Sequence, residues 1–200
     1  MEKINEFELN RQLFHIFLGV LLVILLLYDL IDKKIILITL ALGLILSYLI
    51  KNTKTKVPII HFLLQTFERK SDIEKLPGKG VIFYFIGTSI SLFLFPKETA
   101  MASIMILALG DSVSHLYGIH YGRIKHPLSK TKFLEGTIAG LVAGFTGALF
   151  FVKPIEALLA SSAAMIVEAI EIKIGTEQVD DNLIMPVVAG AMVWIIRLIK

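Results

Sequence analysis

The chain has 200 residues, of which 56% are hydrophobic and 18% are charged, and its mean hydropathy is +0.77. Soluble domains carry roughly 25% charged residues, so this composition excludes an ordinary soluble domain and predicts an integral membrane protein. The sequence has no cysteine, which excludes a disulfide framework and any thiolate metal site. The net charge of +3 is small, so the placement of the charges is more informative than their sum.

Seven apolar segments have about the length that a hydrocarbon core of roughly 30 Å requires. We therefore expect an all-α polytopic bundle of about seven transmembrane helices, forming one domain over residues 1–200. No small-residue cleavage site follows the first segment, so we expect no removable signal peptide. The expected spans are 13–31, 35–50, 80–96, 98–118, 135–153, 155–174 and 182–199.

Two polar connections interrupt the apolar segments, at 51–79 and 119–134. Within the first, the stretch "VPIIHFLLQTF" is too short to span, and its apolar residues recur at helical spacing. This pattern indicates an amphipathic helix on the membrane surface, although a packed connector fits the same pattern. We expect His120 and His126 to lie in the second connection.

Lysine and arginine set the orientation of a membrane protein. With these spans, 14 of the 20 Lys and Arg residues fall on the side of the N-terminus and the two polar connections. The N-terminus and both connections are therefore expected in the cytoplasm, and the C-terminus outside.

Most of the unusual polar residues fall at this same side. Asp111 follows an apolar run in "ILALGDSVSHLYG", and an ionisable residue at membrane depth indicates a function. Two alternatives stay open, since Asp180 or Asp181 also suits a helix N-cap and Glu168 suits a surface group. Besides Asp111, the residues expected at this face are Arg11, His15, Glu168, Glu171, Asp180, Asp181 and Asn182. Carboxylates, bases and a basic loop at one membrane face predict a site that handles phosphate.

The stretch from Asp111 to Glu135 contains the parts that phosphoryl transfer needs. Asp111 suits a divalent cation, and Gly118 and Gly122 fall on the same helix face, where they allow a nucleotide or a backbone to come close. Glu135 lies where the fifth segment begins, a position that favours a helix N-terminus. Four cations of the intervening loop suffice to neutralise a triphosphate, namely Arg123, Lys125, Lys130 and Lys132.

Small residues in the fifth and sixth segments predict close helix packing behind this stretch. Gly136, Gly140 and Gly144 repeat a four-residue spacing, and the sixth segment repeats small residues over 157–164. We expect both segments in the interior of the bundle.

The stretch "GDSVSHLYGIHYGRIKHPLSKTKFLEGTIAG" resembles the core motif of the membrane lipid kinases that use CTP: dolichol kinase, phytol kinase and CTP-dependent diacylglycerol kinase. "LNRQLFHIFLG" and "VDDNLIMPVVAG" are similar to the N-terminal and C-terminal segments of that family. Two residues depart from its pattern: Ser114, where alanine is frequent, and Phe133, where a hydroxyl residue follows the lysine. The related phosphatidate cytidylyltransferases end in a signature that is missing from this sequence, which favours a kinase.

The resemblance implies CTP-dependent phosphorylation of a membrane lipid alcohol, for which we expect a polyprenol such as dolichol, with Mg²⁺ as cofactor and without a nucleic-acid partner. The alternatives are a diacylglycerol or phytol kinase, a phosphatidate cytidylyltransferase, and a small transporter; the one-sided polar residues argue against a transporter. The expected catalytic residues are Asp111, Lys132, Glu135 and His15, the expected nucleotide-binding residues are Gly118, Gly122, Arg123, Ser129, Lys130 and Lys132, and the expected metal ligands are Asp111 and Asp181.

Overall fold

The computed structural model describes residues 5–53, 58–170, 172–174 and 177–199. The described part is helical apart from a pair of two-residue strands, in agreement with the predicted all-α class. Its elements are α1 (Glu6–Leu27), α2 (Lys33–Thr53), α3 (Pro58–Phe67), α4 (Lys70–Lys75), α5 (Lys79–Leu94), α6 (Lys97–Met105), the π-helical η1 (Ile106–Asp111), α7 (Ser112–Tyr121), α8 (Leu134–Ala148), α9 (Pro154–Ala169), β1 (Lys173–Ile174), β2 (Glu177–Gln178) and α10 (Asp181–Ile199).

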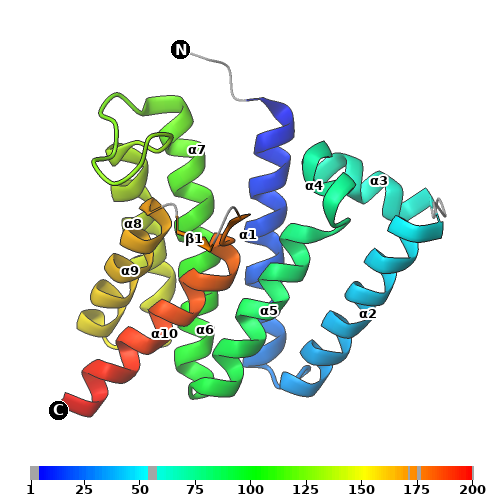
Figure 1. Cartoon of the computed structure of the whole chain (residues 1–200). Helices are drawn as coiled ribbons and strands as arrows, with labels where there is room; N and C mark the ends of the chain where they lie inside the picture. Colours follow the sequence, from blue (N-terminus) through cyan, green and yellow to red (C-terminus); the bar gives the residue numbers. More distant parts are fainter. Residues whose placement is uncertain (1–4, 54–57, 171, 175–176, 200) are drawn as a thin grey trace.

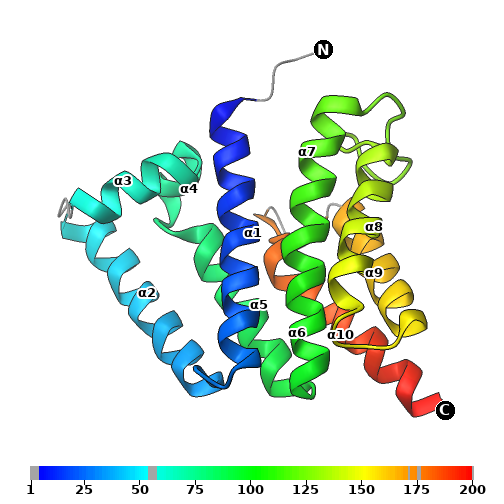
Figure 2. The same cartoon turned by 180° about the vertical axis from the view of Figure 1, so that it is seen from behind.

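One continuous helix, built from α6, η1 and α7, forms the centre of the bundle (Figures 1 and 2). Two-thirds of its apolar window is buried (67%), against 28% for α1 and α10 and 11% for α2. Its buried side chains include Ile104, Ile106 and Leu107, which pack with Met165 of α9 and Met185 of α10. The helix that carries Asp111 is therefore fixed by neighbours on several sides.

Each predicted span contains a helix, but the helices differ in length. Four are long and apolar enough to cross a membrane: Glu6–Leu27, Lys33–Asn52, Lys97–Tyr121 and Asp181–Ile199. The helices α5, α8 and α9 have 16, 15 and 16 residues. At 1.5 Å per residue they reach only about 22–24 Å. The number of spans, seven, stays a prediction.

Two predicted boundaries were wrong. The fourth segment does not end at 118, because the helix continues to Tyr121 and includes His120, which was expected in a loop. Asp111 lies well inside this helix, as it does in the predicted segment. The sixth segment does not reach 174, because α9 ends at Ala169 and the chain then forms the antiparallel pair β1–β2. Hydropathy alone does not mark these ends, since the flanking residues are themselves mostly apolar or small.

Glycines allow α8 to approach the central helix closely. A Cβ on Gly140 would meet the carbonyl oxygen of Gly110 at 2.5 Å, and one on Gly136 would meet that of Ser114 at 2.5 Å. On α9, Ala157, Ala160, Ser161 and Ala164 are fully buried. The predicted small-residue packing of these two segments is confirmed.

An ion pair between an exposed arginine and a buried glutamate joins the helices at the end of the bundle opposite the polar connections. Arg197 of α10 donates to both carboxylate oxygens of Glu156 at 3.1 and 3.0 Å and to Thr99 Oγ1 of α6 at 3.2 Å. Glu156 also accepts from the backbone N–H of Lys153, which closes the first turn of α9. This contact links α6, α9 and α10 away from Asp111.

The connection between α2 and α5 forms the predicted short helix α3, which crosses between α1 and α2 (Figure 2). Phe67 stacks on Phe14 of α1 with ring centroids 4.5 Å apart. Ile59 and Phe62 are exposed, as expected for a helix on a membrane surface. Next to it, Glu68 accepts from the backbone N–H of Gly78 at 2.6 Å and so caps α5. Burial raises the pKa of the Glu68 carboxyl, and these backbone contacts oppose that rise.

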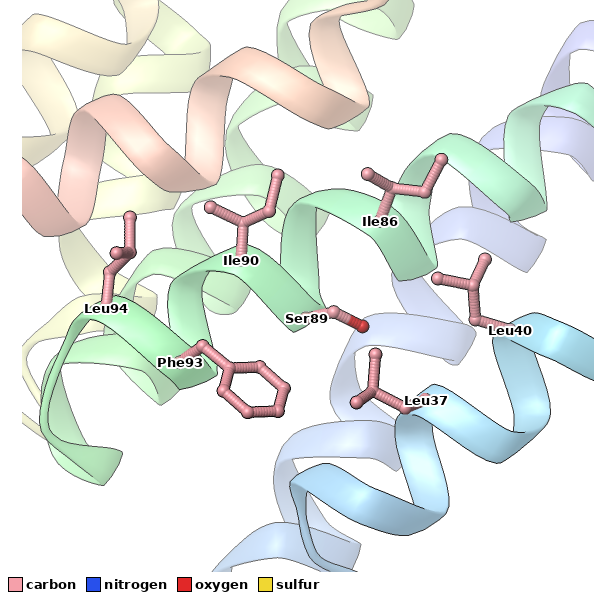
Figure 3. A pocket seen from close by; sticks show the side chains of 7 residues that line it. All are labelled: Leu37, Leu40, Ile86, Ser89, Ile90, Phe93 and Leu94. Atoms are coloured by element: carbon pink, nitrogen blue, oxygen red, sulfur yellow. The ribbon is translucent and has the colours of Figure 1, made fainter.

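An apolar groove of about 380 Å³ lies between α2 and α5 (Figure 3). Its lining is almost entirely hydrocarbon, and Ser89 supplies the only hydroxyl among the lining side chains. The lining residues are Leu37, Leu40, Ile86, Ser89, Ile90, Phe93 and Leu94.

The glycine packing gives a prediction. Gly140→Ala should lower the thermal unfolding temperature in detergent, because its Cβ meets a backbone oxygen and overpacking of this kind costs roughly 1–3 kcal/mol. Gly43→Ala is the matched control, since nothing lies within 4 Å of its added Cβ. The control should unfold at the same temperature or slightly higher, because alanine favours the helix over glycine. Equal unfolding temperatures for wild type and Gly140→Ala would contradict the packing described here.

Candidate metal and nucleotide site

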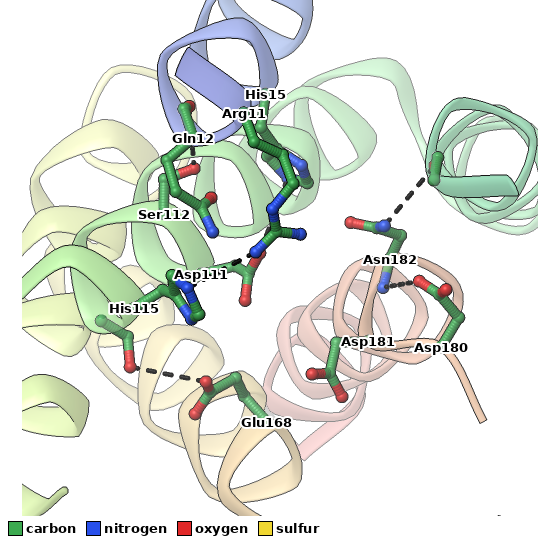
Figure 4. Close-up of polar contacts among 12 residues, drawn as sticks. Arg11, Gln12, His15, Asp111, Ser112, His115, Glu168, Asp180, Asp181 and Asn182 are labelled. Carbon is green, nitrogen blue, oxygen red and sulfur yellow. Dashed lines mark hydrogen bonds and ion pairs between the residues drawn. The ribbon is translucent and has the colours of Figure 1, made fainter. Parts of the chain in front are cut away.

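Three carboxylates from three helices meet in the bundle. Asp111 ends η1, Glu168 lies in the last turn of α9, and Asp181 begins α10 (Figure 4). One oxygen from each lies within 4.8 Å of the other two. Carboxylate oxygens in a compact group are the donors that Mg²⁺ prefers, so this cluster fits the predicted cofactor. Asp111 and Asp181 were predicted as metal ligands, and the structure adds Glu168.

The burial of Glu168 decides between its two interpretations. Its side chain is almost fully buried, with the residue 2% exposed, so the surface-group alternative was wrong. Oε1 accepts from Ser114 Oγ at 3.4 Å, whereas Oε2 is buried without a hydrogen-bond partner among the described residues. A buried carboxylate oxygen without a partner costs free energy, which a cation bound there would recover. Glu171, which was considered together with Glu168, lies outside the described residues.

Lys132 reaches this cluster from the loop between α7 and α8. Its Nζ donates to Glu168 Oε1 at 2.7 Å, to Asp181 Oδ2 at 3.1 Å and to the backbone carbonyl of Glu168. Burial alone would lower the pKa of the Lys132 ammonium, but the carboxylates of Glu168 and Asp181 outweigh it and raise that pKa. The lysine is therefore charged and neutralises part of the cluster.

Local contacts shape the loop that carries Lys132. Ser129 Oγ accepts from the backbone N–H of Lys132 at 3.1 Å, and the Lys132 carbonyl accepts from His126 at 3.0 Å. Glu135 Oε1 accepts from the backbone N–H groups of Arg123 and Ile124, both at 3.1 Å. Glu135 and Ser129, predicted as catalytic and nucleotide-binding residues, thus hold the backbone of the loop.

Of the remaining predicted residues of the motif, Gly118 lies in α7 and the others lie along the same loop. A Cβ on Gly118 would lie 3.7 Å from Gly136, and one on Gly122 would meet the Phe133 ring at 2.3 Å. Phe133, which departs from the family pattern, also carries Lys125 over its ring at 3.9 Å. Its aromatic ring therefore fills a packing position. Arg123 and Lys130 are exposed on the loop.

The neighbouring pair of aspartates divides into two roles. Asp180 accepts from the backbone N–H of Asn182 at 3.1 Å and is the N-cap of α10, so that alternative is confirmed for Asp180. Burial raises the pKa of its carboxyl. Asp181 instead turns to the cluster and Lys132.

The N-terminal helix adds basic groups beside Asp111. His15 Nε2 lies 4.0 Å from Asp111 Oδ2, and its ring meets the edge of Tyr84 at 4.8 Å. Figure 4 shows Arg11 and His15 pointing from α1 toward the carboxylates of the other helices. The structure thus brings together four of the predicted residues: Asp111, Asp181, Lys132 and His15.

Glu8 joins Arg11 to His115 and Arg69, and it was not predicted as a site residue. Its Oε2 accepts from Arg11 Nη2 at 2.9 Å and lies 3.0 Å from His115 Nε2, and its Oε1 accepts from Arg69 Nη2 at 3.2 Å. The spacing of Glu8 and Arg11 on one helix face indicates only the first of these contacts. The others join α1 to residues about 60 and 107 positions later, and no local pattern predicts them.

The bundle and its site define a class: a membrane-embedded helical protein with a buried carboxylate cluster suited to a divalent cation and a lysine-bearing loop suited to phosphate. The chain is similar to CTP-dependent membrane lipid kinases, among them proteins named as diacylglycerol and phytol kinases. The resemblance found in the sequence is thereby confirmed.

The similarities behind this assignment are as follows. Protein MJ1137 of Methanocaldococcus jannaschii, an uncharacterized protein, is 30% identical over 190 residues, which cover 93% of this chain and 92% of that protein. CTP-dependent diacylglycerol kinase 1 of Schizosaccharomyces pombe is 30% identical over 138 residues, or 62% of each chain. Phytol kinase 1 of Arabidopsis thaliana is 26% identical over 141 residues, which cover 62% of this chain and 45% of that protein.

The chain thus spans about half to two-thirds of the length of the relatives that are named as kinases. No family model and no solved structure matches the chain.

The carboxylate cluster gives a prediction that can be tested without measuring enzyme activity. The purified chain should bind Mn²⁺, and Asp111→Asn should weaken this binding by at least about tenfold, since even the loss of an outer-shell partner of a metal costs 10- to 100-fold. Electron paramagnetic resonance of free Mn²⁺ measures the affinity. Asp72→Asn is the control, because Asp72 pairs with Lys79 away from the cluster. Equal affinities for both variants would remove Asp111 from the ligand set.

Proposed function

We propose that the chain transfers the γ-phosphoryl group of CTP to the hydroxyl of a membrane lipid alcohol. The observation that carries this proposal is the convergence of Asp111, Glu168 and Asp181 with Lys132 of the basic loop. Phosphoryl transfer needs chiefly a positioned triphosphate and the neutralisation of its charge. The names of the relatives support CTP as the donor and a lipid as the acceptor.

In this proposal, Asp111, Glu168 and Asp181 hold Mg²⁺, which neutralises phosphate charge when bound. Lys132 and Arg123 contact the phosphates, and Glu135 and Ser129 keep their loop in shape. The nucleotide-binding stretch is completed by Gly118, in the last turns of α7, and by Gly122 and Lys130 in the loop.

His15 and Asp111 serve the acceptor. A bond forms between the lipid oxygen and the γ-phosphorus, the bond from that phosphorus to the bridging oxygen breaks, and CDP leaves. The proton of the hydroxyl passes to His15, whose Nε2 is 4.0 Å from Asp111. Arg11 and His115, joined through Glu8, support this side of the site.

The identity of the lipid acceptor is the most specific part of the proposal. The relatives are named for diacylglycerol and phytol, and the sequence interpretation favoured a polyprenol such as dolichol. A panel of these three lipids and phosphatidate with γ-labelled CTP distinguishes them at equal surface concentration. We expect label on at least one lipid alcohol; label retained in pyrophosphate, with a CDP-lipid as product, would indicate a cytidylyltransferase, and no chemistry at all would favour a transporter.

The same assay tests the site. Asp111→Asn should reduce phosphoryl transfer by roughly 10²–10³-fold, the loss typical when one electrostatic contact to the reacting group is removed. Its bundle should stay folded, because an uncharged side chain is less costly at this depth. Asp72→Asn should retain wild-type turnover. Near-normal turnover of a folded Asp111→Asn sample would contradict the assignment.

We further propose that seven helices lie in the membrane, with the N-terminus and the site facing the cytoplasm, as the distribution of Lys and Arg favours. Single cysteines test this proposal directly because the chain has none. Ser71→Cys should react with an impermeant thiol reagent from the cytoplasmic side, and Lys34→Cys from the opposite side. Both positions are exposed in the structure. Labelling of both from one side would exclude this orientation.

A further inference from the structure

Lys132 occupies the position of a cation within the carboxylate cluster. Its Nζ holds Glu168 Oε1 at 2.7 Å and Asp181 Oδ2 at 3.1 Å, so it engages two of the three carboxylates that are suited to a metal. A divalent cation held by the same three carboxylates would lie next to the ammonium group, and the two positive charges would repel each other. The ammonium group and the metal are therefore rivals for this site.

The cluster retains binding capacity that the lysine does not use. Glu168 Oε2 is buried and without a hydrogen-bond partner among the described residues, and Asp111 adds a third carboxyl group close by. One ammonium group can compensate the charge of only one of these three carboxyl groups. A doubly charged ion would neutralise the cluster better than the lysine does.

The loop is built so that the side chain of Lys132 can move while its backbone stays. Ser129 Oγ and the backbone of His126 hold the main chain of Lys132 on both sides. The four-carbon stem of lysine, in contrast, is flexible and its ammonium has no fixed geometry. Leaving the cluster requires only that rotamers change.

We propose that Lys132 is the built-in counter-ion of the Asp111–Glu168–Asp181 cluster, and that a divalent cation displaces it and thereby releases it to bind nucleotide phosphate. This inference rests on the proposed function only in naming the nucleotide. Because a phosphate group stabilises the released lysine, metal and nucleotide each favour the binding of the other. Such coupling is reciprocal and typically amounts to about 5- to 150-fold in affinity.

The reactivity of the amine reports where Nζ lies. Purified chain in detergent is treated briefly with an amine-acylating reagent, with EDTA or with Mg²⁺ and without nucleotide, and each lysine is quantified by mass spectrometry. We expect Mg²⁺ to increase the acylation of Lys132 roughly tenfold, in the range of site-to-site coupling. Adding a nonhydrolysable CTP analogue should protect it again. Lys125, in the same loop but placed over Phe133, is the internal control and should not respond.

Two variants separate displacement from a general effect of salt. Glu168→Gln removes the negative charge at the shorter carboxylate contact of Lys132, so acylation in EDTA should be higher than in the wild type. Asp111→Asn keeps the hydrogen bonds of Lys132 to Glu168 and Asp181 but lacks one metal ligand. Acylation of Lys132 should therefore stay low with and without Mg²⁺.

Lys132 that stays protected while Mn²⁺ binds to the wild type would show that the two cations coexist, and the inference would be wrong. An equal response to Mg²⁺ in Asp111→Asn would also overturn it. Failure of the proposed function looks different, since Mg²⁺ would then release Lys132 in a chain that phosphorylates no lipid.

Discussion

The structure depends on one electrostatic constraint, which is that three carboxylates share a small volume inside an apolar bundle. Like charges at this distance repel, and burial adds to the free-energy cost of each. Asp111, Glu168 and Asp181 are separated by about 57 and 13 residues along the chain, so only the folded bundle brings them together. Lys132 offsets part of that cost, which makes the loop that carries it a component of the folded core as well as of the site.

The rest of the bundle can be understood as the support for this arrangement. Gly136 and Gly140 bring α8 close to the central helix, so the loop before α8 starts from a fixed point. Glu156 and Arg197 fasten α9 to α10 at the end opposite Glu168 and Asp181. Breaking this ion pair is costly because it leaves the buried carboxylate of Glu156 unpaired. The two helices that supply Glu168 and Asp181 are thus also joined at a point far from the carboxylate cluster.

Much of the fold was predictable from the sequence, because long apolar runs in a chain of low charge have few other solutions. The local sequence also indicated that Asp111 is unusual at membrane depth and that the spacing of small residues in α8 allows close helix packing. The lengths of the helices were not, since the structure ends α9 at Ala169 where hydropathy continues. His120 shows the same limit, because α7 continues to Tyr121, beyond the end of the fourth apolar segment.

The residues of the site were predictable from the sequence, but the contacts between them were not. Carboxylates, lysine and histidine at one membrane face are rare enough to be noticed individually. That Asp181 faces Lys132 while Asp180 caps α10 depends on a single turn of backbone. Glu8 gave no signal beyond its spacing to Arg11, because its other partners come from distant parts of the chain. Glu168 was ambiguous until its burial was known.

The π-helical turn before Asp111 has a consequence for how sequences of this kind should be compared. A π turn closes its hydrogen bonds over five residues instead of four and so accommodates one residue more than an α turn. Asp111, at the end of η1, and the residues of α7 are therefore rotated about the helix axis. The rotation is about 100° relative to a regular helix continued from Lys97–Met105, given 3.6 residues per α turn. A homologue that is one residue shorter between these points would keep its hydropathy and its motif, and yet would direct the aspartate to a different neighbour. In such an alignment, a single-residue gap in the fourth apolar segment carries more weight than many substitutions around it.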